Sequence, residues 1–247
     1  MTVEHIELAG KRILLTGGTT GIGRETLHLL VCAGARVVTF GRHGSELEDA
    51  LASAHGQSGE AIGLTGDASS KEDIDRVFGI IDEELGGIDI LIASAAVGAQ
   101  PIHEMPDADW RYVVETNLVG CMACAREAIL RMQAQGAGHL VFVGSISTEI
   151  KAVGESVYSA TKAGAQAFAE TLRKEVEKDN IRVSIVQPGS VDTDMQTASE
   201  EEKHEAISQH EMLQAREIAE AITFVLTRSE ACDIVSLRIE PRLQKTA

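Results

Sequence analysis

The sequence has few aromatic residues, little proline and no long hydrophobic run. Phe, Trp and Tyr make up 3% of the 247 residues, so aliphatic side chains must build the interior. No apolar run approaches the roughly 20 residues of a transmembrane helix. The first residues also lack the basic-then-apolar order of a signal peptide. We therefore expect a cytoplasmic protein.

Positive charge is in the minority as well. Lys and Arg number 22 against 38 Asp and Glu, which gives a formal net charge of −16 at pH 7. Such a charge repels the phosphates of nucleic acids and the anionic surface of membranes. We therefore expect neither nucleic acid nor membrane as a partner.

The four cysteines show no complete metal or disulfide pattern. Cys121 and Cys124 are spaced as C-x-x-C, but no second pair lies nearby, and a structural zinc site needs four ligands. We expect small buried thiols and no metal site, with a redox or metal role as the alternative.

Short apolar runs alternate with helical patterns along the whole chain. The runs are rich in β-branched residues and mostly apolar on both faces, which is typical of buried parallel strands. The predicted strands cover 12–16, 36–40, 61–66, 88–93, 139–144, 182–187 and 233–239, of which 61–66 is the weakest. The predicted helices cover 21–33, 44–55, 70–85, 107–134, 156–179 and 215–228.

This alternation predicts the α/β class: a Rossmann-like, doubly wound fold with a mostly parallel seven-stranded sheet and helices on both faces. No repeat, long linker or change of composition interrupts it. We therefore expect residues 1–247 to form a single dinucleotide-binding domain.

A glycine-rich stretch, LLTGGTTGIGRET, follows the first predicted strand. Gly17, Gly21 and Gly23 come directly after the strand and open a helix. Glycine allows the tight turn and lets backbone N–H groups approach a phosphate at the positive end of the helix. Because a strand precedes these glycines and a helix follows them, they indicate a nucleotide-binding loop.

Further along, SVYSATKAG places Tyr158 and Lys162 four residues apart within a helical pattern. Residues at this spacing lie on the same side of a helix, about one turn apart. The positive charge of the lysine favours the phenolate form of the tyrosine, which suits proton transfer. An isolated pair of this kind is more often a surface pair, so its meaning depends on the rest of the site.

Together these motifs resemble the short-chain dehydrogenase/reductase family, from about residue 10 to residue 195. Thr16-Gly17-x-x-x-Gly21-Ile22-Gly23 is similar to the family's TGxxxGIG, and the Tyr158 and Lys162 pair to its YxxxK. The resemblance implies a catalytic tetrad of Asn117, Ser145, Tyr158 and Lys162. It implies cofactor contacts by Gly17, Thr19, Thr20, Gly21, Ile22, Gly23, Arg42, Asp67, Ala68, Ala95, Tyr158, Lys162, Pro188, Gly189, Val191 and Thr193.

The resemblance also implies reversible hydride transfer between a nicotinamide cofactor and a small carbonyl or alcohol compound. Tyr158 would exchange a proton with the substrate oxygen, Ser145 would donate a hydrogen bond to that oxygen, and Lys162 would hold the nicotinamide ribose. Asn117 would hold a water that passes protons to Lys162, or would satisfy a backbone group at a helix kink. Ser147 is a second hydroxyl near the substrate.

One departure from the family follows the fourth strand. Where relatives carry NNAG, this chain has Ala93, Ser94, Ala95 and Ala96, so two amide side chains that brace the sheet and the cofactor are absent. This leaves open a catalytically silent, nicotinamide-binding regulatory or assembly subunit as the alternative to an enzyme.

The end of the second strand bears on the choice of cofactor. Folds that prefer NAD place a carboxylate there, on the ribose 2′-hydroxyl, but this chain has Gly41 and Arg42. A guanidinium at that place can pair with a 2′-phosphate. Thr20 stands where relatives often carry a second basic residue. We therefore favour NADP(H) over NAD(H), with a solvated loop role for Arg42 as the alternative.

The sequence is less informative about the residues that would contact the substrate. We expect a mixed lining by Ile146, Glu149, Ile150, Gly154, Val191 and Met195. The acidic stretch 197–213, part of a segment near 190–213, is expected to cover the site, with a solvated helix as the alternative.

The end of the chain resembles a branch of NADP-dependent dehydrogenases of 3-hydroxy acids and serine, and a ketone or aldehyde reductase is equally compatible. A 3-oxoacyl carrier reductase is disfavoured because residues 190–202 hold no Lys or Arg. The resemblance further implies a homotetramer or homodimer.

Overall fold

A seven-stranded parallel sheet forms the centre of the computed structural model, which describes residues 5–196 and 198–244. Its strands lie in the order β3 (Glu60–Thr65), β2 (Arg36–Gly41), β1 (Arg12–Thr16), β4 (Ile90–Ala93), β5 (Gly138–Val143), β6 (Ile181–Pro188) and β9 (Ser236–Ile239). This arrangement confirms the predicted α/β, Rossmann-like fold class.

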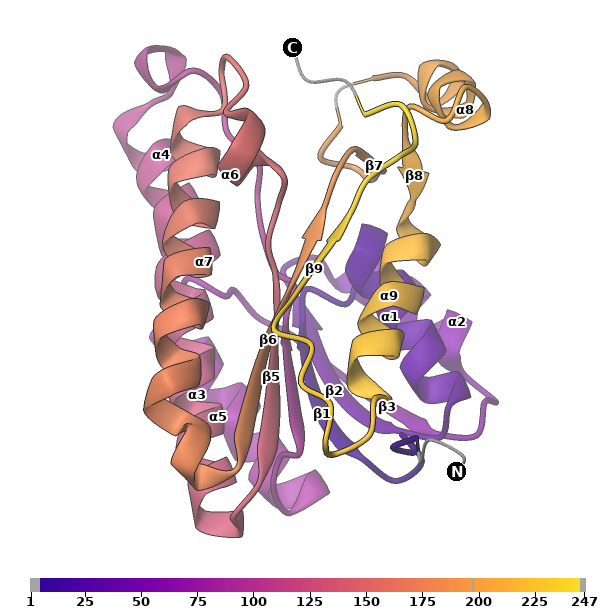
Figure 1. Cartoon of the computed structure of the whole chain (residues 1–247), viewed down its shortest axis with the longest axis vertical. Coiled ribbons are helices and arrows are strands. Elements are labelled where there is room, and N and C mark those ends of the chain that lie inside the picture. The colour runs from indigo at the N-terminus through magenta and orange to yellow at the C-terminus, as the bar shows by residue number, and fades with distance from the viewer. Residues whose placement is uncertain (1–4, 197, 245–247) are drawn as a thin grey trace.

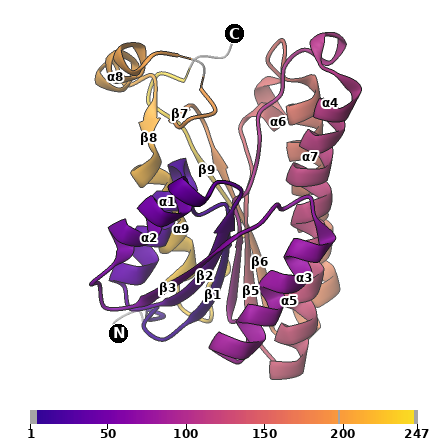
Figure 2. The same ribbon diagram turned by 180° about the vertical axis from the view of Figure 1, so that it is seen from behind.

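Helices cover both faces of the sheet (Figures 1 and 2). One face carries α1 (Gly21–Cys32), α2 (Gly44–Ala54) and α9 (Ala215–Leu226). The other carries α3 (Lys71–Ile80), α4 (Asp107–Val114), α5 (Cys121–Gln135) and α7 (Ser156–Val176). None of the helices in the described part of the chain combines the length and the apolar run that crossing a bilayer would need.

Two separate apolar cores follow from this layering. In β1, the side chain of Leu14 packs into one core, whereas Ile13 and Leu15 on the opposite face pack into the other. All three are fully buried, because successive side chains of a strand point to opposite sides of the sheet. A strand buried in this way must be apolar at every position, which explains the continuous runs in the sequence.

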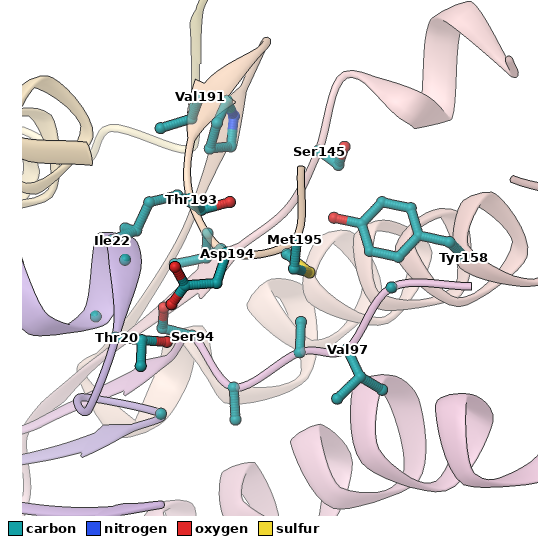
Figure 3. Close-up of a pocket in the computed structure, with 18 of the residues that line it drawn as sticks. Thr20, Ile22, Ser94, Val97, Ser145, Tyr158, Val191, Thr193, Asp194 and Met195 are labelled. Carbon is teal, nitrogen blue, oxygen red and sulfur yellow. The ribbon is translucent and has the colours of Figure 1, made fainter. Parts of the chain in front are cut away.

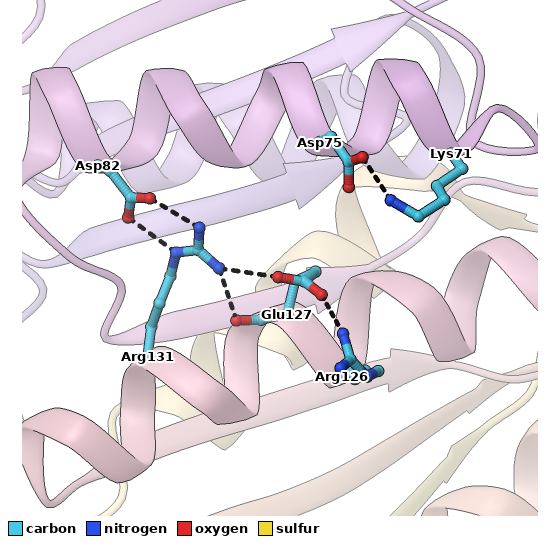
Figure 4. Close-up of polar contacts among 6 residues, drawn as sticks. All are labelled: Lys71, Asp75, Asp82, Arg126, Glu127 and Arg131. Carbon is cyan, nitrogen blue, oxygen red and sulfur yellow. Dashed lines mark hydrogen bonds and ion pairs between the residues drawn. The ribbon is translucent and has the colours of Figure 1, made fainter.

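Charged side chains tie α5 at the surface to Asp82, in the π-helical segment Ile81–Leu85 that continues α3 (Figure 4). Arg131 of α5 donates to both carboxylate oxygens of Asp82, at 2.7 Å each, and pairs with Glu127 one turn away at 3.2 Å. Lys71 and Asp75 form an exposed pair near the start of α3.

The strand order reverses beside β1, which has β2 as its neighbour on one side and β4 on the other. The chain therefore leaves the carboxyl ends of β1 and β4 in opposite directions, and a crevice opens between the loops that follow them. In open α/β sheets ligands bind in such a crevice.

Several elements differ from those that the sequence predicts. The expected helix 107–134 is interrupted by a π-helical segment, Glu115–Gly120, where a Cβ on Gly120 would lie only 1.9 Å from the carbonyl oxygen of Ala68. The short helix α6 (Ser147–Ile150) was not predicted.

The stretch expected to cover the site also has more structure than predicted. It holds α8 (Glu200–Ser208) and two short paired strands, β7 (Val191–Asp192) and β8 (Leu213–Gln214). The first residue of the expected cover, Thr197, lies outside the described residues. Both views show α8 and α6 at the same end of the molecule.

Candidate active site

A pocket of about 890 Å³ opens at the carboxyl ends of the strands (Figure 3). Every residue predicted to contact the cofactor lines it: Gly17, Thr19, Thr20, Gly21, Ile22, Gly23, Arg42, Asp67, Ala68, Ala95, Tyr158, Lys162, Pro188, Gly189, Val191 and Thr193. Of the predicted tetrad, Ser145, Tyr158 and Lys162 line the pocket. Asn117 is not among the lining residues.

The glycine loop depends on the absence of side chains. Gly17 has a φ of +70°, and a Cβ there would lie 2.8 Å from the Cα of Ala95. A Cβ on Gly23 would lie 2.0 Å from the carbonyl oxygen of Gly17. The backbone N–H of Gly17 donates to the carbonyl of Phe40 at 3.2 Å, which ties the loop to the end of β2. The absence of a side chain at Gly17 therefore lets the loop pass close to the segment after β4, and at Gly23 it lets the loop pack against its own backbone.

The loop after β4, where the family's amides are missing, is held by Thr16. The hydroxyl of Thr16 accepts hydrogen bonds from the backbone N–H groups of Ser94 and Ala95, both at 3.0 Å. The turn beside the glycine loop is thus fixed by the end of β1, without amide side chains at 93 and 94.

Three polar side chains meet at the far end of the glycine loop. The guanidinium of Arg42 lies 5.5 Å from the ring centroid of Tyr112, and the Tyr112 hydroxyl donates to Asp67 at 2.8 Å. The other Asp67 oxygen accepts bonds from the backbone N–H and hydroxyl of Ser69, both at 2.8 Å. Burial by itself would raise the pKa of Asp67, but the bonds from Ser69 and Tyr112 outweigh it and hold that pKa below its usual value.

No motif in the sequence marks Tyr112, and sequence reasoning missed it. It reaches Asp67 because α4 packs beside the loop that follows β3. Tyr112 and Tyr158 are the two tyrosines of the chain, and both line the pocket.

Tyr158 and Lys162 come from the first turns of α7. The Tyr158 hydroxyl points into the pocket on the side where Ser145 lies (Figure 3). The Lys162 ammonium is buried, donates to the carbonyl of Val143 at 2.9 Å, and lies 5.7 Å from the Tyr158 ring centroid. Since Val143 ends β5 and Ser145 follows it, one strand end positions both the lysine and the serine.

Asn117 lies in the π-helical segment behind this group. Its side-chain oxygen accepts from the N–H of Val97, and its amide donates to the Val97 carbonyl, both at 2.8 Å. The amide also lies 3.3 Å from the Thr161 hydroxyl. The side chain thus satisfies backbone groups and joins the loop after β4 to α7.

A hydrogen-bonded chain leads from Ser145 to an acid that sequence reasoning missed. The Ser145 hydroxyl donates to Ser147 at 3.0 Å, and the Ser147 hydroxyl donates to Glu155 at 2.9 Å. Ser145 also accepts a bond from the backbone N–H of Ser147 at 3.1 Å. Ser147 therefore orients the Ser145 hydroxyl.

The rest of the expected substrate lining is only partly found. Ile146, Ile150, Val191 and Met195 line the pocket, whereas Glu149 and Gly154 do not. The segment 190–213, which includes the stretch expected to cover the site, contributes further lining residues, which are Ser190, Asp194, Gln196, Ala206, Glu211 and Met212.

Two long-range contacts hold this side in place. Lys203 of α8 has a side chain that is only 6% exposed, and its ammonium pairs with Asp192 at 3.4 Å and Glu200 at 3.0 Å. The backbone N–H of Ser190 donates to the side chain of Gln244, near the end of the described chain, at 2.8 Å.

Cys121 and Cys124 lie on α5, behind the sheet. Burial raises the pKa of the Cys121 thiol to about 11 and that of Cys124 to about 12, so both thiols stay protonated at neutral pH. Over residues 5–196 and 198–244, no group of three or more His, Cys, Asp or Glu side chains is placed to hold a metal ion.

Comparisons with known proteins agree with this geometry. Residues 11–204 match the family model of the short chain dehydrogenases. An uncharacterized oxidoreductase of Staphylococcus aureus (strain N315) is 30% identical over 235 residues, covering 95% of this chain and 98% of the relative. Carbonyl reductase family member 4 of Danio rerio is 32% identical over 212 residues, or 85% and 88% of the two chains.

Solved structures of a short-chain type dehydrogenase/reductase and of a ketoreductase are also similar to this chain. A short-chain type dehydrogenase/reductase from Mycobacterium marinum is similar at a TM-score of 0.86 and 25% identity, with 96% of each chain covered. A variant of actinorhodin polyketide ketoreductase, solved with NADPH, is similar at a TM-score of 0.85 and 28% identity, covering 95% of this chain and 97% of that one.

Proposed function

The chain belongs to the short-chain dehydrogenase family of oxidoreductases, and from this premise we propose that it transfers a hydride between NADP(H) and a small carbonyl or hydroxyl compound. The observation that carries the proposal is that Tyr158, Lys162 and Ser145 lie in the same pocket as the glycine loop. This arrangement supports proton transfer by Tyr158 beside a nucleotide bound at the glycine loop.

The lining residues fit a dinucleotide. Members of the family bind nicotinamide cofactors, and this pocket has the size of a ligand site, with the N-terminus of α1 opening into it beside Gly17 and Gly21. A Cβ on Gly21 would lie 3.1 Å from Thr193, so the space there exists because the side chain is missing. Bound at this place, the cofactor supplies or accepts the hydride.

In the reducing direction, the substrate carbon gains the hydride and the substrate oxygen gains a proton from the Tyr158 hydroxyl. Ser145 stabilises the charge that develops on that oxygen when its hydroxyl turns from Ser147 and donates to the substrate. The buried ammonium of Lys162 lies one turn from Tyr158, 5.7 Å from its ring centroid, and so places a positive charge beside the group that gives up the proton. Oxidation of an alcohol follows the same steps in reverse.

Arg42 supports NADP(H) as the cofactor. Its side chain is exposed at the end of β2, with no carboxylate at Gly41 to take a ribose 2′-hydroxyl. A guanidinium pairs well with a phosphate, and the related ketoreductase that was solved with NADPH is consistent with this choice.

A catalytically silent cofactor-binding subunit is the second candidate, because Ala93–Ala96 replace the family's amides. The bonds from Ser94 and Ala95 to Thr16 weigh against it, since they hold the same turn by backbone groups.

One experiment separates the two candidates. The purified protein is titrated with NADPH and with NADH, followed by cofactor fluorescence, and is then assayed for NADPH consumption with a panel of ketones and aldehydes. Tighter binding of NADPH together with turnover supports the proposal. Binding without turnover of any carbonyl supports the silent subunit, and binding of neither cofactor overturns both.

A further inference from the structure

The carboxylate of Glu155 forms no capping hydrogen bond with its own helix, α7. Glu155 is the N-cap residue of α7, yet its side chain accepts no hydrogen bond from the first turn of that helix. Instead the carboxylate accepts the hydroxyl of Ser147, which belongs to α6. A glutamate that only capped the helix would face the N–H groups of α7.

Glu155 lies near Tyr158 and Ser145, the residues proposed to meet the substrate oxygen. It lines the pocket, is half-buried, and precedes Tyr158 by three residues. It is two hydrogen bonds away from the Ser145 hydroxyl, through Ser147. A substituent near the carbon whose oxygen meets Ser145 and Tyr158 is therefore within reach of Glu155.

The charges around this part of the pocket are mainly negative. Among the described lining residues from 145–162 and 190–212, the acids are Glu155, Asp194 and Glu211, and the cation is Lys162. Lys162 already donates to the carbonyl of Val143, and Glu155 takes part in none of the salt bridges formed within residues 5–196 and 198–244. Within residues 5–196 and 198–244, Glu155 thus has no cationic partner.

We propose that Glu155 selects the substrate by charge: it favours neutral or cationic carbonyl and alcohol compounds with a hydroxyl or amino group near the reacting carbon, and it disfavours carboxylates. This inference rests on the proposed function and names the substrate class of the same pocket. A hydroxyl or ammonium group donates to the carboxylate, which can only accept. A carboxylate of the substrate can make no such bond and meets a like charge.

The size of the effect follows from Coulomb's law. Two like charges about 6 Å apart repel enough to weaken binding about 3-fold at the dielectric constant of water and about 100-fold at an effective value of 20. The half-buried position of Glu155 lies between these limits.

The test compares two matched pairs of substrates with NADPH: methyl acetoacetate against acetoacetate, and aminoacetone against hydroxyacetone. We expect the unchanged protein to have the higher kcat/KM for methyl acetoacetate. In Glu155→Gln, which keeps the shape and still accepts from Ser147, the ratio of ester to acid should fall about 3- to 100-fold. The advantage of aminoacetone over hydroxyacetone should shrink as well.

Glu149→Gln is the matched control. Glu149 is an exposed residue of α6 that does not line the pocket, so the variant loses the same charge without losing the contact. An equal fall of the ester-to-acid ratio in Glu149→Gln would overturn the proposal. So would an unchanged ratio in Glu155→Gln, or a preference of the unchanged protein for acetoacetate.

A binding measurement separates this inference from the proposed function. Isobutyramide and isobutyrate are titrated calorimetrically into the protein loaded with NADP⁺, where neither can react. Weaker binding of isobutyrate that recovers in Glu155→Gln supports the inference even if no ketone is reduced, in which case only the proposed reaction fails. Equal binding of both compounds, with ketone reduction intact, overturns the inference alone.

Discussion

The two ends of the pocket, which we name the cofactor half and the substrate half after the proposed function, are held by different kinds of contact. In the cofactor half, which consists of 17–23, Arg42, Asp67 and 93–96, backbone groups do much of the positioning. Gly17 donates to the carbonyl of Phe40, and Ser94 and Ala95 donate to the Thr16 hydroxyl at the end of β1. These partners lie on neighbouring strand ends, so the sheet itself fixes their distances.

In the substrate half, which consists of 145–150, Glu155, Tyr158 and 191–196, side chains from separate segments do this work. Ser147 reaches Glu155, Lys203 reaches Asp192, and Gln244 accepts from the backbone of Ser190. The cofactor half therefore tolerates few changes of backbone, whereas the substrate half can change its preference through single side chains.

The largest effect is expected from Tyr158→Phe, which should strongly reduce turnover in the substrate half and leave NADPH binding in the cofactor half. Turnover should fall about 1,000-fold, because a positioned general acid contributes about 10²- to 10⁴-fold. NADPH affinity, measured by fluorescence titration, should change far less than turnover, measured by NADPH consumption. Near-normal turnover in this variant would refute the assignment of Tyr158.

Tyr112→Phe is the matched control, since it removes the other tyrosine hydroxyl of the chain. It breaks the bond to Asp67 in the cofactor half, so the dissociation constant of NADPH should change by up to about tenfold. A loss of turnover as large as that of Tyr158→Phe would show that the two halves are not separable.

Arg42→Gln should act on the cofactor half alone. Loss of a charge-assisted bond to the 2′-phosphate should raise the dissociation constant of NADPH about 10- to 100-fold, and leave that of NADH nearly unchanged. Arg111→Gln is the control, because Arg111 pairs with Asp107 outside the pocket and carries the same charge. Equal losses for NADPH and NADH would mean that Arg42 does not distinguish them.

His139 lies on β5, in the sheet that carries both halves of the pocket, and affects how the stability of the fold depends on pH. Burial, with a smaller effect of the positive Arg182, lowers the pKa of His139 to about 3, well below its usual 6.5. The unfolded chain therefore takes up a proton between about pH 6.5 and 3 that the folded chain does not. Stability from this group falls as the pH falls, by about 1.4 kcal/mol per unit in that window.

His139→Asn should flatten this part of the pH dependence, while Ser184, the partner of His139 at 2.9 Å, remains. Unfolding free energies from denaturant titrations between about pH 7 and 5 give the slope in both proteins. An identical slope would contradict the buried neutral histidine. Cofactor affinity at neutral pH should stay the same, because His139 does not line the pocket.

Lys203→Met should have the smallest effect and only in the substrate half. Loss of the pairs with Asp192 and Glu200 loosens α8, so the KM for a ketone should rise by up to about fivefold with no change in NADPH affinity. Lys71→Met removes the exposed pair on α3 shown in Figure 4 and should leave both values unchanged. A higher dissociation constant of NADPH in Lys203→Met would show that α8 also serves the cofactor half.

The strands and helices followed well from sequence because each depends on local pattern. The predicted helix 107–134 failed in one place, at Glu115–Gly120, where the close approach of Gly120 to Ala68 and the bonds of Asn117 to Val97 impose a π-helical segment. Helix propensity contains no information about either partner.

The sequence by itself determined the alternation of strands and helices, the glycine loop and the Tyr158 and Lys162 pair. Each of these rests on spacing within one element or one turn, and that spacing fixes geometry before any packing. The predicted tetrad members Ser145, Tyr158 and Lys162 accordingly line one pocket.

Only the tertiary structure decided which acid faces the substrate half. The sequence predicted Glu149, but the single turn of α6 ends at Ile150, Lys151 after it has a φ of 53°, and Gly154 has a φ of +90°. These two turns direct the chain so that Glu155 lines the pocket, while Glu149 stays exposed outside it. Such a reversal depends on packing between α6 and α7, and no spacing in the sequence specifies it.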